Sequence, residues 1–271
     1  MPITLLVDNG SKQAQATLAL RQLASALSAH RGETVHPVSL QHADHIPAEQ
    51  LQHQPAQVFQ SFLLHQLQQG EHHFIVLPLF FGESRALTSF IPEQVEKLQS
   101  EYPQLRVEVA AVTYPLPEGD ERMAQIIAEH VAQSQTSADE KVVLVDHGSP
   151  IPQITAVRDG IAQAAQRIIG RPLDQACMER RQGSEYDFNG QLLADWLSQH
   201  AEQGISEVII AMLFFLPGRH AGACGDIEEI CAAVKQQYPQ LNYTISPLIS
   251  EHPLLVEILN SRLQSLLHHH Q

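Results

Sequence analysis

The chain has 271 residues, which is enough for about two ordinary domains that each bury a core of their own. Hydrophobic residues make up 44% and charged residues 17%, a composition typical of folded proteins rather than disordered ones. Sixteen Lys and Arg against thirty Asp and Glu give a net charge of −14, which argues against a nucleic-acid partner because binding a phosphate backbone usually needs a basic face.

Cysteine usage and the N-terminal residues bear on the compartment. The three cysteines all lie in the second half, and an odd number does not form the disulfide framework of a secreted protein. The apolar run from Ile3 to Val7 is too short for a signal sequence or a membrane span. We therefore expect a cytoplasmic protein with no membrane partner.

Short apolar segments alternate with longer amphipathic ones along the whole chain. In the first half this pattern predicts strands at 3–7, 34–39, 73–80 and 106–112, and helices at about 13–30, 56–69, 89–101 and 119–133. In the second half it predicts strands at 141–145, 173–178, 207–214 and 242–248, and helices at about 153–169, 189–203, 225–237 and 253–267. Such alternation is typical of βαβ units, so each half is expected to form a parallel four-stranded sheet flanked by helices, an α/β fold.

Three phrases occur in the same order in both halves of the chain. They are LVDNGS at 6–11 and LVDHGS at 144–149, FIVLPLFF at 74–81 and VIIAMLFF at 208–215, and YPQL at 102–105 and 238–241. Their offsets of 138, 134 and 136 residues are much longer than a solenoid repeat, so they indicate two tandem domains.

The polar stretch SQTSADE, residues 134–140, separates the two halves and lacks apolar periodicity. It predicts a boundary there, with domains at 1–135 and 140–271. Because the linker is short, the two domains are expected to pack together and to leave a cleft for a ligand.

Two histidines follow predicted strands of the second half. His147 comes after the strand at 141–145, and His220 lies in the loop after the strand at 207–214. Ligands of parallel α/β sheets gather at the carboxyl ends of the strands, and neighbouring strands lie about 5 Å apart. If these two strands are neighbours, both imidazoles can bind one divalent transition metal such as Co, Ni or Fe. Ser149, two residues after His147, suits the cap of the next helix.

These phrases resemble the class II tetrapyrrole chelatases of the CbiX and SirB type, which insert cobalt or iron into sirohydrochlorin. VLVDHGSP, at 143–150, is similar to that family's first strand and metal-binding histidine, and LFFLPGRHAGACGDIEE, at 213–229, to its second histidine loop. ISEHPLLVEIL, at 249–259, is similar to its closing strand and helix. Both halves share the plan, which implies two tandem chelatase-like domains with the intact site in the second.

The resemblance implies a role for each candidate residue. His147 and His220 would hold the incoming metal and accept protons from the pyrrole nitrogens, while Glu179 would relay protons or metal hydration. Sirohydrochlorin carries many carboxylates, which arginines bind with paired hydrogen bonds. The candidate substrate-binding residues are Ser149, Arg180, Arg181, Arg219 and His252.

Two stretches depart from the family pattern. The segment RRQGSEYDFN at 180–189 is unusual, and its Tyr186 and Phe188 would line a macrocycle pocket or belong to the core. In the first half Asn9 replaces the first histidine, and the loop at 79–93 contains none. The first half is therefore expected to be degenerate. Small members of the family pair two identical chains, so the duplication predicts a monomer with an internal pseudo-dimer.

The predicted function is ATP-independent insertion of cobalt, iron or nickel into sirohydrochlorin or a related tetrapyrrole, with the metal as a substrate and no nucleotide cofactor. The chain contains no GxxxxGK[ST] sequence, the motif that would indicate nucleotide-driven chemistry. Two alternatives stay open: a carrier that binds metal or tetrapyrrole without turnover, and a chelatase for a different tetrapyrrole.

Overall fold

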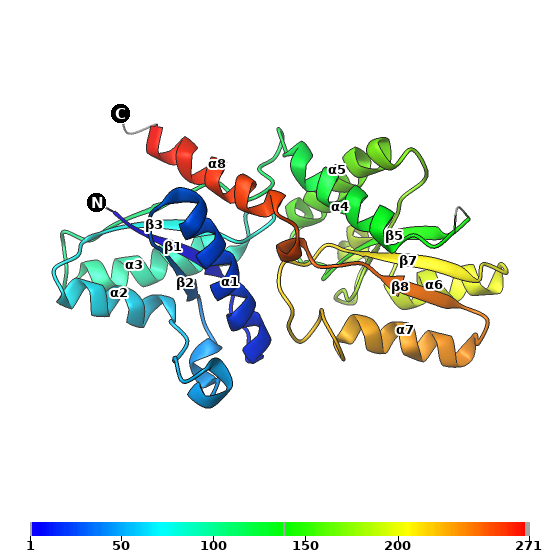
Figure 1. Cartoon of the computed structure of the whole chain (residues 1–271), viewed down its shortest axis with the longest axis horizontal. Helices are drawn as coiled ribbons and strands as arrows, with labels where there is room; N and C mark the ends of the chain where they lie inside the picture. The colour runs from blue at the N-terminus through cyan, green and yellow to red at the C-terminus, as the bar shows by residue number, and fades with distance from the viewer. Residues whose placement is uncertain (1, 138, 269–271) are drawn as a thin grey trace. The chain divides into compact units, whose positions relative to one another are not determined.

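The computed structural model describes residues 2–137 and 139–268, so His269 and His270 of the histidine-rich tail lie outside the described residues. It divides into two compact units, Met1–Pro115 with Leu255–Gln271, and Leu116–Leu254. Each unit contains one sheet of four parallel strands flanked by helices, which confirms the predicted fold class (Figure 1). No helix in the described part of the chain is both long and apolar enough to cross a membrane.

Unit 1 is built on strands β1 (Ile3–Asp8), β2 (Val35–Ser39), β3 (His73–Pro78) and β4 (Arg106–Val109), in the order β2-β1-β3-β4. Its helices are α1 (Ala14–Arg31), α2 (Phe59–Gln68), α3 (Ile91–Gln99) and α8 (Leu254–His268). Residues 4–8 of β1 and 74–78 of β3 are buried, as expected for central parallel strands that are covered on both faces.

Unit 2 repeats the same topology. Its strands are β5 (Lys141–Asp146), β6 (Asp174–Cys177), β7 (Glu207–Met212) and β8 (Asn242–Ile245), in the order β6-β5-β7-β8. Its helices are α4 (Glu121–Ser134), α5 (Pro152–Ile169), α6 (Leu193–Glu202) and α7 (Asp226–Gln237). All strands and helices predicted from the sequence are present, with ends that differ by a few residues.

The last helix of each repeat belongs to the unit built on the other repeat. Helix α4 of the first repeat packs against α5 and β7 in unit 2, whereas α8 belongs almost entirely to unit 1 (Figure 1). In unit 1 the Arg262 guanidinium donates to the carbonyls of Val112 and Thr113, and Arg31 donates to the Asn260 amide oxygen. Each compact unit therefore contains a terminal helix of the other repeat, and the domain bounds expected at 1–135 and 140–271 stay a prediction.

Hydrogen bonds join described residues of the polar stretch between α4 and β5. The buried Glu140 carboxylate accepts hydrogen bonds from the backbone amides of Thr136 and Ser137 and from the Thr136 hydroxyl. Its polar composition resembles a linker because these side chains satisfy the backbone of a turn.

The predicted elements omit several short helical segments. These are the 3-10 helices Ala43–His45, Ala48–Leu51, Ser184–Asn189 and Ile249–Glu251, and the π turn Ala86–Phe90. Segments this short have no apolar periodicity to reveal them.

One tight turn follows the first strand of each repeat, and glycine is required there. Gly10 and Gly148 have φ angles of 88° and 87°. A Cβ atom on either would lie 1.8 Å from the Gln41 carbonyl oxygen or 1.9 Å from that of Glu179. Only glycine combines positive φ with such a close approach, so the two turns share one backbone plan.

Candidate functional site

The structure brings His147 and His220 together. His147 follows β5 and His220 lies in the loop after β7, and these two strands are neighbours in the sheet of unit 2. The two imidazole rings meet edge to face, with centroids 4.6 Å apart and planes inclined at 73°. The two side chains therefore lie together at the carboxyl ends of these strands, and their roles in metal binding and catalysis stay predictions.

Hydrogen bonds orient both rings in the same way. Nδ1 of His147 lies 3.0 Å from the Gly148 carbonyl oxygen, and Nδ1 of His220 lies 2.6 Å from Oδ2 of Asp226. A carbonyl and a carboxylate can only accept, so Nδ1 carries the proton in each ring. In a neutral ring, Nε2 is then the nitrogen that can bind a metal or accept a proton.

Glu179 stands next to this pair. Its Oε1 lies 3.3 Å from Nε2 of His147, and its backbone amide donates to the His147 carbonyl oxygen at 3.1 Å. Its side chain is 64% exposed. Among the residues that the structure describes, no three His, Cys, Asp or Glu side chains are arranged to hold one metal ion. A metal ion held by the two histidines alone would keep open coordination positions.

Arg180 and Arg181, the two predicted arginines that follow Glu179 in the sequence, line a pocket of about 420 Å³. Arg180 contacts the Asp187 carboxylate and the Gly190 carbonyl, both at 3.1 Å. The Arg181 guanidinium lies over the Tyr186 ring, 5.8 Å from its centroid. The pocket is lined by Arg180, Arg181, Gln182, Gly183, Ser184, Asp187 and Leu192.

The three other candidate residues have different surroundings. Arg219 is 78% exposed, with Nε 3.7 Å from Oδ2 of Asp226. Ser149 does not cap α5, contrary to the expectation: the N-cap position is Ile151, and the Ser149 hydroxyl accepts from the Ile151 amide before the helix begins. His252 is buried and contacts α4, where its Nε2 lies 2.9 Å from Oε2 of Glu129. A role of His252 in substrate binding stays a prediction.

A buried polar network adjoins His147 and was not predicted from the sequence. The Arg158 guanidinium, 3% exposed, donates to Oδ1 of Asp146 and to the carbonyl of Asn189, both at 2.9 Å. Burial raises the pKa of the Asp146 carboxyl, and the charge of Arg158 opposes that rise. The available signal was an arginine on the apolar face of a helix, with Leu20 at the matching place in the first repeat.

Comparison with known proteins agrees with the duplication. The model of the CbiX family matches residues 3–134 and again residues 141–266. The chain belongs to the CbiX family. Both repeats are covered, including the half that lacks the histidines.

A curated relative of this CbiX-family chain is the chloroplastic sirohydrochlorin ferrochelatase of Arabidopsis thaliana, 26% identical over 129 residues. The match covers 47% of this chain and 53% of the relative, so the chain spans about half the length of the curated relative it matches.

Solved structures show the same fold. SirB from Bacillus subtilis with Fe³⁺ superimposes with a TM-score of 0.68 at 19% identity, over 97% of this chain and 95% of SirB. SirB from B. subtilis subspecies spizizenii in complex with cobalt gives 0.66 at 18% identity, over 97% and 94%. DR2241 from Deinococcus radiodurans, a multi-domain protein with structural similarity to chelatases, gives 0.63 at 17% identity, over 97% and 54%.

The first CbiX repeat differs from the second at the first histidine and at further positions around the same turn. Asn9 replaces His147, and Gln41, which approaches the turn glycine as Glu179 does in the second repeat, replaces that carboxylate. Asp8, which corresponds to Asp146, is buried, and burial raises its pKa to about 6. Its Oδ1 accepts no hydrogen bond from the described residues.

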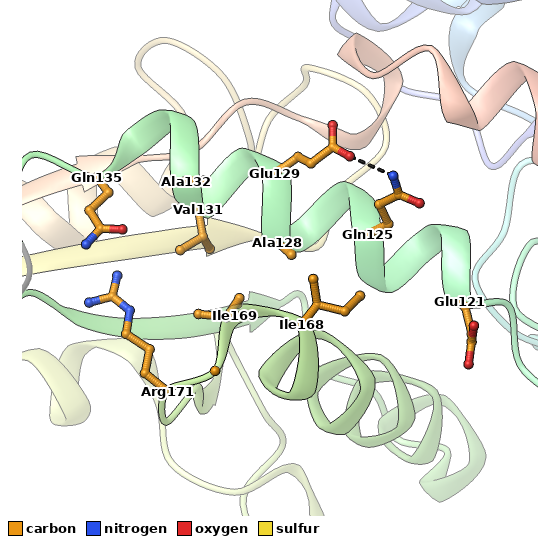
Figure 2. Close-up of a pocket in the computed structure, with 11 residues that line it drawn as sticks. Glu121, Gln125, Ala128, Glu129, Val131, Ala132, Gln135, Ile168, Ile169 and Arg171 are labelled. Carbon is orange, nitrogen blue, oxygen red and sulfur yellow. Dashed lines mark hydrogen bonds between the residues drawn. The ribbon is translucent and has the colours of Figure 1, made fainter.

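A groove of about 830 Å³ runs between α4 and α5 and contains none of the candidate site residues (Figure 2). Its floor is apolar, with Val131, Ile168 and Ile169, and Arg171 lies at one end. A spacious groove is not by itself evidence of catalysis, so the paired histidines define the candidate site.

Proposed function

We propose that this chain inserts a divalent metal ion into sirohydrochlorin or a closely related tetrapyrrole, without a nucleotide. The observation that carries the proposal is the pair His147 and His220, whose rings lie 4.6 Å apart at the strand ends of a CbiX-family fold. The Arabidopsis relative supports the substrate class by its name, and the SirB structures with Fe³⁺ and cobalt support the class of metal.

The chemistry needs groups that release a metal and remove two protons. When M²⁺ enters the macrocycle, two pyrrole N–H bonds break, two M–N bonds form in their place, and two protons leave. Nε2 of His147 and of His220 would bind the metal first. Each Nε2 is free to accept a proton once its bond to the metal has broken. Glu179, 3.3 Å from Nε2 of His147, is placed to carry a proton onward to solvent.

Substrate binding would use the cationic residues around the pair. Arg180 and Arg181 line the pocket after Glu179, and Arg219 precedes His220 with a largely exposed side chain. These guanidinium groups suit the carboxylates of sirohydrochlorin, which would replace the Asp187 contact of Arg180. Local positive charge is needed here because the chain as a whole carries −14.

Two histidines do not select among cobalt, iron and nickel, because imidazole binds all three. All three cysteines are free thiols, which suits a reducing compartment, and we propose the cytoplasm. The duplicated fold supports a monomer.

The test is a spectrophotometric assay with sirohydrochlorin and Co²⁺, Fe²⁺ or Ni²⁺. We expect protein-dependent conversion of the metal-free absorption spectrum, which is lost in the double variant His147→Ala with His220→Ala. Asn9→Ala is the matched control, because Asn9 occupies the same turn of the first repeat, and it should leave the rate unchanged.

The outcomes separate the alternatives. Binding of Co²⁺ or sirohydrochlorin without conversion would identify a carrier and overturn the enzymatic proposal. Faster conversion of another tetrapyrrole in direct competition would change the substrate but keep the reaction. Activity that survives the double histidine substitution would show that the site lies elsewhere.

A further inference from the structure

Arg158 is a buried cation with a hydrogen-bond partner for each guanidinium nitrogen. Besides Asp146 and the Asn189 carbonyl, it donates from Nε to the Gln175 side chain at 3.1 Å. Burying a guanidinium group costs free energy unless it is fully paired, and an apolar residue of similar volume often serves stability equally well. Fold stability alone therefore does not explain an arginine at this place.

The partners of Arg158 belong to the segments that carry the candidate site. Asp146 immediately precedes His147 and also accepts from the amide of Gly148 at 3.1 Å. The completely buried Asn189 side chain binds both backbone groups of Ser149: its Oδ1 accepts from the amide and its Nδ2 donates to the carbonyl, each at 2.9 Å. The turn that holds His147 is thus fixed on both sides.

The first repeat shows the same scaffold without this network. Helices α1 and α5 have 18 residues each and both of their ends differ by 138 positions, so Leu20 stands where the second repeat has Arg158. Leu20 is buried, and Oδ1 of the neighbouring Asp8 has no hydrogen-bond partner in the described chain.

An arginine still supports the corresponding loop of the first repeat. Arg21, one position after Leu20, donates to the carbonyls of Leu51, Gln54 and Pro55. Holding a loop carbonyl with an arginine is therefore common to both repeats. The ion pair with the strand-end aspartate occurs where the turn carries a histidine.

We propose that Arg158, acting through Asp146 and Asn189, is a positioning residue that holds His147 where it can share one metal ion with His220. The inference rests on the proposed function and deepens it. The planar guanidinium reaches three partners in fixed directions, which a single ammonium group cannot reproduce.

The main test variant is Asp146→Asn combined with Arg158→Leu. It removes both charges together, so no unpaired charge stays buried, and Asn at 146 can still accept from Gly148. Arg158→Lys is the conservative variant, and Arg21→Leu is the matched control in the first repeat. Folding of each full-length variant is checked by thermal unfolding.

The readouts are the Kd for Co²⁺, the absorption bands of bound Co²⁺, and kcat and KM for metal insertion. We expect the double variant to bind Co²⁺ about 10–100-fold more weakly, as for other residues that orient metal ligands, with altered Co²⁺ bands. Arg158→Lys should recover part of the affinity, and Arg21→Leu should match the wild type. A purely structural role would change thermal stability and leave the bands unaltered.

Failure of the inference and failure of the proposed function give different results. A folded double variant with wild-type Co²⁺ affinity, bands and insertion rate overturns the positioning role and leaves the function intact. If the wild type binds Co²⁺ but inserts none, the proposed function fails, and Co²⁺ binding still decides the role of Arg158. A wild type that binds no Co²⁺ at the histidine pair overturns both.

Discussion

Oδ2 of Asp226 accepts the hydrogen bond of Nδ1 of His220 at 2.6 Å, and it orients a ring whose centroid lies 4.6 Å from that of His147. Carboxylates that orient a metal-binding histidine typically contribute 10–100-fold to metal affinity or activity. We expect Asp226→Asn to weaken Co²⁺ binding by about that factor, because a neutral amide accepts a weaker hydrogen bond. Calorimetric or spectroscopic titration with Co²⁺ measures the change.

The control for this prediction is Glu229→Gln. Asp226 and Glu229 both lie in the first turn of α7, so both carboxylates interact with the helix dipole. Glu229 is exposed, and a change in helix stability alone would affect the two variants similarly. Equal Co²⁺ affinity in the two variants would show that Asp226 does not act through His220.

Substitution of the two turn glycines distinguishes an effect on protein stability from an effect on metal binding. Gly148→Ala and Gly10→Ala would each place a Cβ within 2 Å of a carbonyl oxygen at positive φ. Each should lower the free energy of unfolding by at least about 1–3 kcal/mol. Only Gly148→Ala should also weaken Co²⁺ binding, because relief of the clash moves His147 and Glu179. Urea denaturation and Co²⁺ titration of both variants measure these effects. An equal loss of Co²⁺ affinity in Gly10→Ala and Gly148→Ala would contradict the prediction.

Sequence periodicity predicted every strand and regular helix, because buried parallel strands and amphipathic helices leave long apolar patterns. It also led us to expect His147 and His220 at one sheet edge, because both follow predicted strands of a parallel sheet whose carboxyl ends lie on the same side. The exchange of α4 and α8 was beyond it, since an apolar helix face does not reveal which sheet it covers. The network of Arg158 was missed because its partners at 146, 175 and 189 are distant in the sequence and meet only in the fold.

The buried Asp8 carboxyl should lower the free energy of unfolding at neutral pH, where the group is ionised. Its pKa rises from 3.8 to about 6 because burial penalises the charged form. Between these values the folded chain holds a proton that the unfolded chain has released, so stability falls as pH rises through this range. Above pH 6 the full penalty applies, about 3 kcal/mol for a shift of roughly two pKa units. We therefore expect Asp8→Asn to raise the free energy of unfolding at pH 7–8 and to have little effect below pH 4.

Urea denaturation of the wild type and Asp8→Asn from pH 4 to pH 8 measures this difference. Asp146→Asn is the contrasting variant at the same place in the second repeat. It leaves Arg158 buried without its counter-ion and should lower stability at pH 7 by about 3–5 kcal/mol. A pH-independent difference between wild type and Asp8→Asn would contradict the assigned titration.

Fragments of the chain test the exchange of the terminal helices. The fragment 116–254 contains the whole of unit 2, including α4, whereas the similar fragment 140–271 has α8 in its place. Without α4, helix α5 and strand β7 lose the contacts that α4 makes, and the buried side chains of Met123, Ile127 and Val131 are missing from the fragment. We expect 116–254 to unfold cooperatively as a monomer and 140–271 to lack a cooperative transition until the fragment 1–137, which carries α4, is added. Circular dichroism melts and size-exclusion chromatography measure this, and a cooperative, monomeric 140–271 would show that the repeat boundary is also the folding boundary.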